Sequence, residues 1–210
     1  MVSQEGSART RLLQAAAAEF AARGFDGATV DRIAARARVN KALVYYYFHS
    51  KTSLYMAILR DVFGAVAAAV IRVRDAGGPP DTQVAEFVQA LAQQALSRPH
   101  FPAIWLREMA DGGRHLDRTV AVELRRVIET LAAMLNDGHR AGTFRTADPF
   151  LIHLSIVSPL LLFLASAPLR TRLKNDIPAS VARVAPAAMV QHLQRSVLAM
   201  LAPNARRRSS

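Results

Sequence analysis

The side chains between residues 29 and 51 include types that hydrogen-bond to nucleic acid. Lys41 can donate to a phosphate oxygen or to the edge of a guanine. The next residue, Ala42, is small enough to let the backbone approach closely, and Leu43 can contact the methyl group of a thymine. This run of three residues therefore predicts contact with the edges of bases.

Three consecutive tyrosines follow, and they add phenolic donors. Because three consecutive residues cover most of a helix circumference, at least one of Tyr45, Tyr46 and Tyr47 must face outward, where its hydroxyl can reach a phosphate. The alternative is that the tyrosines only fill a core or an interface. The hydroxyl of Thr29 and the helix N-termini expected at Thr29 and Lys51 would add phosphate-binding groups.

Two short helices must position these groups. The apolar spacing predicts helices over Val30–Ala37 and Lys41–Phe48, joined by the turn 38–40. Thr29 and Asn40 are suited to cap them, because their side chains can accept hydrogen bonds from the first turn. Two short helices joined by a three-residue turn have helix-turn-helix spacing, in which the second helix enters the DNA major groove with its first turn near the bases.

Helical spacing continues on both sides of this pair. The first helix is expected from about Ala8 to Arg23, ending at Gly24, and Ser50 can cap a long helix from Lys51 to about Arg74. Residues 76–80 form the strongest break, and 169–186 are expected to be a loop with a helical turn. The other expected helices are Thr82–Leu96, Phe101–Ala110, Leu116–Ala141, Pro149–Ser166 and Ala187–Ala202.

The sequence therefore predicts an all-α protein. We expect a three-helix helix-turn-helix DNA-binding domain over residues 8–50 and a larger helical ligand-binding and dimerisation domain over residues 51–202. The tail 203–210 carries three consecutive arginines and is expected to be disordered.

The chain is strongly basic. Its 210 residues include 27 Lys and Arg against 16 Asp and Glu, a formal net charge of +11, and a soluble protein with this charge usually meets a polyanion. The alternative is a GC-rich genome that places arginine freely on solvated surfaces. The lack of cysteine excludes disulfides, zinc fingers and thiol catalysis, and the polar N-terminus lacks the apolar run of a signal peptide, so a cytoplasmic protein is expected.

An enzyme and a membrane protein are the two rival classes. The six histidines are scattered, and HExxH, GxSxG and P-loop motifs are absent, so no catalytic residue, metal or cofactor is expected. The run 149–169 has no charged residue and is long enough to span a bilayer, which leaves a membrane-associated basic helical protein as the alternative. The run also contains serines, a histidine and prolines, and a helix buried on all sides in a soluble oligomer has the same composition.

Residues 9–60 resemble the tetracycline-repressor (TetR) family of regulators. The similarity to the DNA-binding region of that family lies in LLQAAAAEFAARGFDGA, followed by TVDRIAARARVNKALVYYYFHSKTSLYMAIL. The resemblance implies that one set of side chains holds phosphates, namely Thr29, Tyr45, Tyr47 and Lys51. It also implies that a second set faces the groove, namely Lys41, Ala42, Leu43 and Tyr46.

The chain departs from the family pattern at two positions. The family commonly has Gly at the position of Arg38, and Arg in a left-handed turn costs on the order of 1 kcal/mol. The turn is therefore expected to differ slightly or to gain a phosphate contact from Arg38, and we include Arg38 and Asn40 among the DNA-binding candidates. The family also often has Gly at the position of Ala42, which bears on how closely the backbone approaches DNA.

The remainder of the chain resembles the family only loosely, chiefly in RPHFPAIWLREMADGG and GHRAGTFRTADP. The resemblance implies a homodimer in which the last two long helices pair with their mates, and the apolar faces of both helices support this independently. Two recognition helices roughly 34–36 Å apart would then read a near-palindrome in double-stranded DNA. The interface candidates are Ile156, Leu160, Val190, Leu193 and Val197.

The resemblance also implies a pocket for an unknown small-molecule effector between the middle helices, and hence a ligand-released repressor. Trp105 is the leading candidate, because it is the only tryptophan and lies beside the kink expected between Pro99 and Pro102. A set of aromatic residues and methionines is more often plain core. The pocket candidates are Phe63, Phe87, Phe101, Trp105, Met109, Met134 and Phe163.

Overall fold

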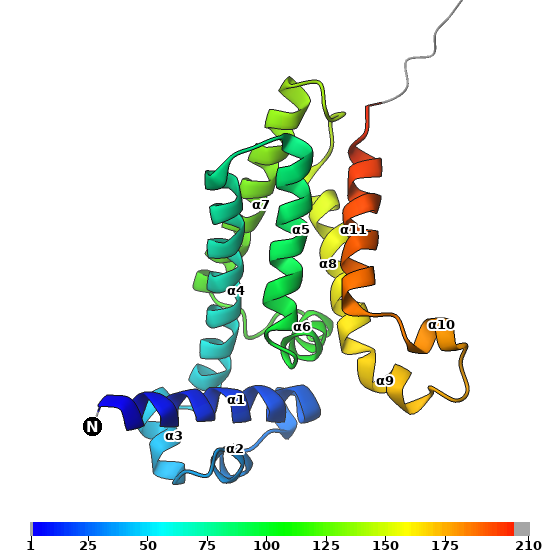
Figure 1. Cartoon of the computed structure of the whole chain (residues 1–210). Helices are drawn as coiled ribbons and strands as arrows, with labels where there is room; N and C mark the ends of the chain where they lie inside the picture. Colours follow the sequence, from blue (N-terminus) through cyan, green and yellow to red (C-terminus); the bar gives the residue numbers. More distant parts are fainter. Residues whose placement is uncertain (1, 204–210) are drawn as a thin grey trace, which may run out of the picture. The chain divides into compact units, whose positions relative to one another are not determined.

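The computed structural model describes residues 2–203, which contain helices and connections but no strand (Figure 1). Side chains are described from Ala8 onward, except at residue 182. The all-α fold predicted from the sequence is confirmed. The helices are α1 (Val2–Gly27), α2 (Val30–Ala37), α3 (Lys41–Phe48), α4 (Lys51–Ala76), α5 (Pro80–Leu96), α6 (Phe101–Ala110), α7 (Arg118–Arg140), α8 (Pro149–Ala165), α9 (Ala167–Arg172), α10 (Ala179–Ala182) and α11 (Pro186–Leu201).

The predicted bounds of α2, α3 and α6 agree with the structure residue by residue. α1 begins earlier than expected, and Gly24 interrupts it with a φ of 72°, a conformation that glycine adopts without strain. The segment 169–186, expected to be a loop with one helical turn, includes most of α9 and all of α10. Residues 204–210, for which the sequence predicts disorder, lie outside the described residues.

The chain forms two compact units whose boundary differs from the one expected after residue 50. The first unit comprises the chain up to Gly64 together with Arg98–Val122, and the second comprises Ala65–Ser97 and the chain from Glu123. α6 belongs to the first unit because it packs against α1. The division of function between residues 8–50 and 51–202 stays a prediction.

The first unit has an apolar core built by one face of each helix. α1 packs against α2 and α6, and α2 packs against α3. The side chains of Leu12, Phe20, Ile33, Val44 and Leu54 are almost completely buried. Because each buried side chain of this size contributes about 1.5–3 kcal/mol, burial of these faces fixes how the short helices pack.

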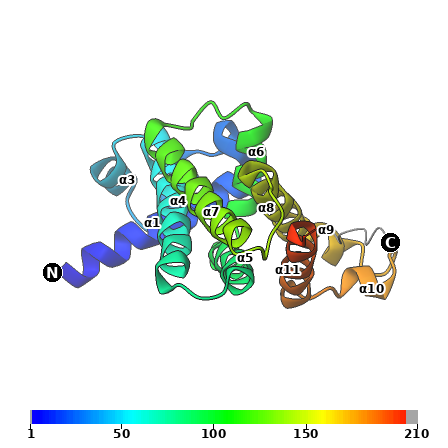
Figure 2. The ribbon, with the colours of Figure 1, turned by 90° about the horizontal axis from the view of Figure 1, so that it is seen from above.

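In the second unit, α5, α8 and α11 lie side by side (Figures 1 and 2). Phe87, Leu131 and Ile156 are among the most deeply buried side chains of this unit. The connection after α7 folds back onto that helix at Gly138, where an added Cβ would lie 2.0 Å from Phe144 Cδ2. Only glycine fits this close approach.

The run on which the membrane alternative rests forms α8, which has 17 residues. That is short of the roughly 20 residues that a membrane-spanning helix needs. By length and composition alone, α4 is the single helix in the described part of the chain that meets this requirement, and 56% of its most apolar window is buried inside the protein. A core helix meets the same requirement, so α4 is weak evidence for a membrane.

Candidate DNA-binding site

The helix-turn-helix consists of α2 and α3, each anchored by its apolar face. Ile33 and Ala37 are buried on α2, and Val44 and Phe48 are buried on α3. With these positions inside, the opposite faces of both helices are left to solvent. The local sequence thus fixes which residues the pair presents.

Side-chain caps fix where these helices begin, as predicted. The Thr29 hydroxyl accepts a hydrogen bond from Arg32 N at 3.3 Å, and Asn40 Oδ1 accepts one from Ala42 N at 2.8 Å. Ser50 Oγ accepts from Ser53 N at 3.0 Å and caps α4. Asn40 therefore acts first on the backbone of α3, and its amide NH₂ group is the part that would be able to donate to DNA.

Arg38 ends α2 in the left-handed conformation, with φ 54° and ψ 48°. Its backbone N–H bonds to the last turn of α2, while its side chain is exposed. A non-glycine residue pays on the order of 1 kcal/mol for this conformation. The turn therefore keeps the usual backbone geometry and accepts the strain of an arginine.

Lys41 forms an ion pair that the sequence analysis missed. Its Nζ lies 2.8 Å from Asp31 Oδ1, and the hydrogen bond with Asp31 raises the pKa of the ammonium group. Both side chains are largely exposed. The pair joins the first turn of α2 to the first turn of α3, so DNA would have to compete with Asp31 for this lysine.

The three tyrosines differ in exposure. Tyr46 is 67% exposed and Tyr45 is 45% exposed, whereas Tyr47 is half-buried with its ring 5.0 Å from that of Tyr46. The prediction that at least one ring faces outward is confirmed. Ala42 is also exposed, and Leu43 is half-buried on the same helix.

Lys51 is already engaged within the protein. Its Nζ donates to Phe25 O at 2.9 Å and to Ala28 O at 3.2 Å, and it lies 4.4 Å from the centre of the Phe25 ring. The lysine thereby ties the start of α4 to the connection between α1 and α2. Because an ammonium group has three N–H donors, one stays available for a phosphate.

The aromatic effector candidates fall into separate groups. Phe63, Phe101 and Trp105 form a cluster in the first unit, with the Phe63 and Trp105 rings 4.9 Å apart. Met109 points to solvent and is 50% exposed. In the second unit, Phe87 and Met134 are buried, and Arg170 lies over the Phe163 ring at 4.1 Å.

The five interface candidates all face the interior of the second unit. Ile156, Leu160, Val190, Leu193 and Val197 are each at most 5% exposed within a single chain. A second copy would not reach them without opening this core. The outward residues of α8 are also apolar, and they are Phe150, Leu151, Leu154 and Leu162.

Comparison with known proteins agrees with this architecture. Residues 12–58 match the family described as bacterial regulatory proteins, tetR family, and residues 80–195 match the tetracyclin repressor-like C-terminal domain. The HTH-type transcriptional repressor NicS of Pseudomonas putida is 25% identical over 144 residues, which are 68% of each chain. The HTH-type transcriptional regulator RutR of Escherichia coli is 27% identical over 138 residues, which are 66% of this chain and 65% of RutR.

The fold is also found in solved structures. A TetR family transcription regulator from Marinobacter aquaeolei superposes with a TM-score of 0.73 at 18% identity, covering 97% of this chain and 100% of that one. At this identity, the similarity to the solved structure shows the fold alone. The two family matches cover the helix-turn-helix and more than half of the residues that follow it. The chain therefore belongs to the TetR family, whose members are DNA-binding transcriptional regulators and not enzymes.

Proposed function

We propose that this chain is a cytoplasmic repressor that binds a near-palindromic operator as a homodimer and leaves it when a small-molecule effector binds. One observation carries the proposal: Val44 and Phe48 anchor α3 so that Lys41, Tyr45 and Tyr46 project from its other face. The repressor role is supported by NicS, a relative that is named as a repressor.

The candidate DNA-binding groups divide by the part of DNA that they suit. Lys41, Ala42, Leu43 and Tyr46 belong to the face directed at the bases, and direct contacts there would determine sequence preference. Phosphate contacts would come from Tyr45, Tyr47, Thr29, Lys51 and Arg38. The net charge of +11 supports binding to the phosphate backbone.

The dimer interface is proposed on the outer face of α8. Four large apolar side chains lie there at helical spacing, and Leu162 alone is 62% exposed. An apolar stripe of this kind on a soluble protein indicates a protein partner. A second copy of this chain is the partner that fits a palindromic operator, because each copy would bind one half-site. This proposal replaces the interface predicted from the sequence, whose residues are buried within one chain.

The effector site is proposed beside Trp105. Its ring is half-buried and stacks 6.2 Å from Phe101, so a ligand that moved it would disturb α6, which also packs on α1. Titrating the wild type with the effector, once known, would test this placement through the fluorescence of Trp105, the only tryptophan of the chain, and an unchanged spectrum at saturation would contradict it.

Selection of bound duplexes from a random DNA pool tests the proposal directly. At about 150 mM salt, binding by charge alone is weakened, so enriched sequences report base contacts. We expect a near-palindrome, with half-sites about one helical turn apart or a multiple of it. The same selection with Leu43→Ala should return a changed half-site, and an unchanged sequence would contradict the assignment of Leu43 to the groove.

A further inference from the structure

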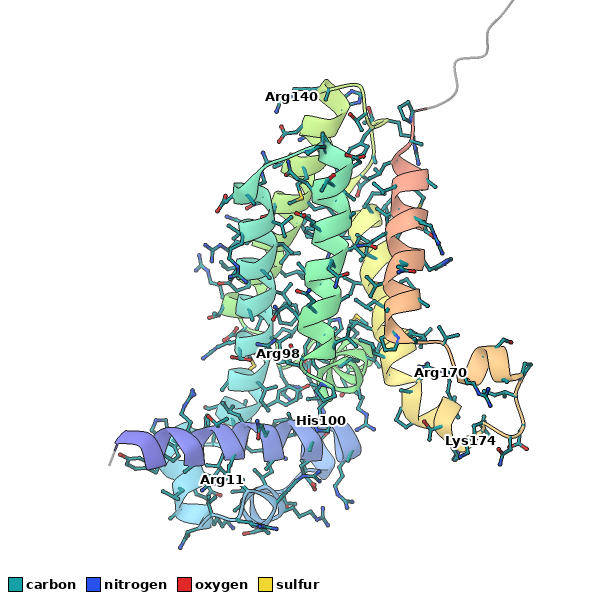
Figure 3. All side chains as sticks on the ribbon, viewed as in Figure 1. Arg11, Arg98, His100, Arg140, Arg170 and Lys174 are labelled. Carbon is teal, nitrogen blue, oxygen red and sulfur yellow. The ribbon has the colours of Figure 1, made fainter. Side chains whose placement is uncertain are left out.

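An open groove of about 490 Å³ on the first unit is lined by basic side chains and by no acidic one. We name it the arginine groove and define it by Arg11 and Gln14 of α1, Arg36 and Arg38 at the end of α2, and His100 before α6. Alanines form the rest of its lining. Figure 3 labels Arg11 and His100.

Two of the arginines carry charges that no described side chain neutralises. Arg11 Nε donates to Ala37 O at 3.3 Å, which places this guanidinium at the C-terminus of α2. Arg36 and Arg38 are exposed, and neither side chain forms an ion pair or hydrogen bond with the residues whose side chains the structure describes, namely 8–203 except 182. Because Arg11 already covers the end of α2, the helix dipole does not require two further cations there.

The backbone conformation of Arg38 bears on the role of its side chain. Its φ of 54° lies in the left-handed region, where glycine would avoid the strain. Strained residues of this kind gather at functional sites, where the side chain has a task that the fold alone does not explain. Here the strained residue is one of those that line the groove.

The remaining wall adds to the positive potential. His100 immediately precedes α6, a helix of ten residues whose N-terminal end carries partial positive charge. Burial lowers the pKa of His100, and the charge of Arg36 lowers it further. Even with a neutral imidazole, the groove therefore keeps the charge of its arginines.

We propose that the arginine groove binds a phosphate group, which Arg36 and Arg38 hold through their guanidinium forks. Guanidinium groups match phosphate in shape and hydrogen bonding, and two or more of them balance its double charge better than the single charge of a carboxylate. The volume falls within the range of roughly 300–1,000 Å³ for small-molecule sites, so room is left for an organic group beside the phosphate. The phosphate belongs to a phosphorylated small molecule or to the backbone of bound DNA.

A ligand in this groove would contact the turn before the recognition helix and the start of α6 together. A phosphorylated small molecule in the groove would go beyond the proposed repressor function, whereas a DNA phosphate there would extend the contact proposed for Arg38 and rests on that function. The site is therefore tested first without DNA. The probe is inorganic pyrophosphate at constant ionic strength, with chloride as the reference anion. The measured signal is the NMR resonance of the His100 imidazole, which is identified by its absence in the His100→Asn variant.

Three variants make the test specific. Arg36→Ala and Arg38→Gly each remove one guanidinium, and Arg38→Gly also relieves backbone strain, so it should stay folded. Arg125→Ala removes an exposed arginine of α7 that is outside the groove and is the matched charge control. We expect pyrophosphate to shift the His100 signal in the wild type and in Arg125→Ala, and to bind at least tenfold more weakly to the two groove variants.

A second measurement identifies the source of the phosphate. The slope of log affinity against log salt is recorded for a random duplex, and it falls by about 0.9 for each lost phosphate contact. A smaller slope in both groove variants than in Arg125→Ala assigns the site to the DNA backbone. An equal slope with weakened pyrophosphate binding assigns it to a small molecule. If the groove variants match Arg125→Ala in both measurements, the arginine groove is not a phosphate site.

Discussion

The Tyr55 hydroxyl donates a hydrogen bond to Glu108 Oε2 over 2.8 Å, and this bond joins α4 to α6 within the first unit. Glu108 is 1% exposed, and its other oxygen accepts from His115 N at 2.8 Å. Burial raises the pKa of Glu108, but the hydrogen bonds from His115 and Tyr55 outweigh it and the net pKa is lowered. Burial and the neighbouring carboxylate both raise the pKa of Tyr55, so the phenol stays protonated and donates.

We predict that Glu108→Ala lowers the free energy of unfolding by about 1–3 kcal/mol, because the Tyr55 hydroxyl and the His115 N–H lose their acceptor. Glu108→Gln keeps an acceptor oxygen and should cost less. Urea unfolding at pH 7 measures both, with Tyr55→Phe as the reference for loss of the donor alone. Wild-type stability in Glu108→Ala would show that the cluster contributes nothing to the fold.

A buried histidine should make stability depend on pH. Burial lowers the pKa of His153 from 6.5 to about 4, and its Nδ1 has no hydrogen-bond partner among the described residues. Between these values the unfolded chain binds the proton and the folded chain does not, so stability falls as pH falls. From pH 7 to pH 5 the loss should be about 2 kcal/mol.

His153→Leu should remove most of that loss. The comparison is made at pH 5 and above, so that Glu108 stays ionised throughout. The pKa of Glu108 is lowered in the folded protein, so the stability that its carboxylate contributes is present above the pKa of the unfolded chain and is lost only at more acidic pH. His192→Ala, at an exposed position of α11, is the control. The same pH dependence in His153→Leu and in the wild type would rule out His153 as its source.

The pair between Lys41 and Asp31 should weaken DNA binding. Asp31→Asn releases Lys41 and removes a negative charge from the DNA-facing helices, so affinity for any duplex should rise by up to about fivefold. Fluorescence anisotropy with a random duplex measures the change. Asp75→Asn removes an exposed charge elsewhere on the chain and corrects for net charge. In a Lys41→Ala background the effect of Asp31→Asn should shrink to that of the control.

A charge on the outer face of α8 should separate the proposed dimer without unfolding it. We expect Leu162→Glu to sediment as a monomer with an unchanged circular dichroism spectrum, because Leu162 lies outside the core. Val122→Glu, at another exposed position, should stay dimeric. Leu193→Glu should instead unfold the second unit, since it buries an unpaired charge. A dimeric Leu162→Glu would place the interface elsewhere.

The local parts of this protein were predictable from its sequence. The caps at Thr29 and Asn40 and the apolar period of α2 and α3 act between residues a few positions apart, so the helix bounds followed from neighbours in the chain. The family match over residues 12–58 rests on this same stretch.

Other features depended on tertiary packing. α8 is apolar on nearly every side, so the spacing of its apolar residues does not indicate which face points inward. In the folded protein, Ile156 and Leu160 are buried in the core of the second unit. Lys41 forms an ion pair with Asp31 of another helix, and Tyr55 donates a hydrogen bond to Glu108, which lies 53 positions away in the sequence. Spacing along one helix constrains its own faces, but contacts between distant segments exist only once the helices have packed against each other.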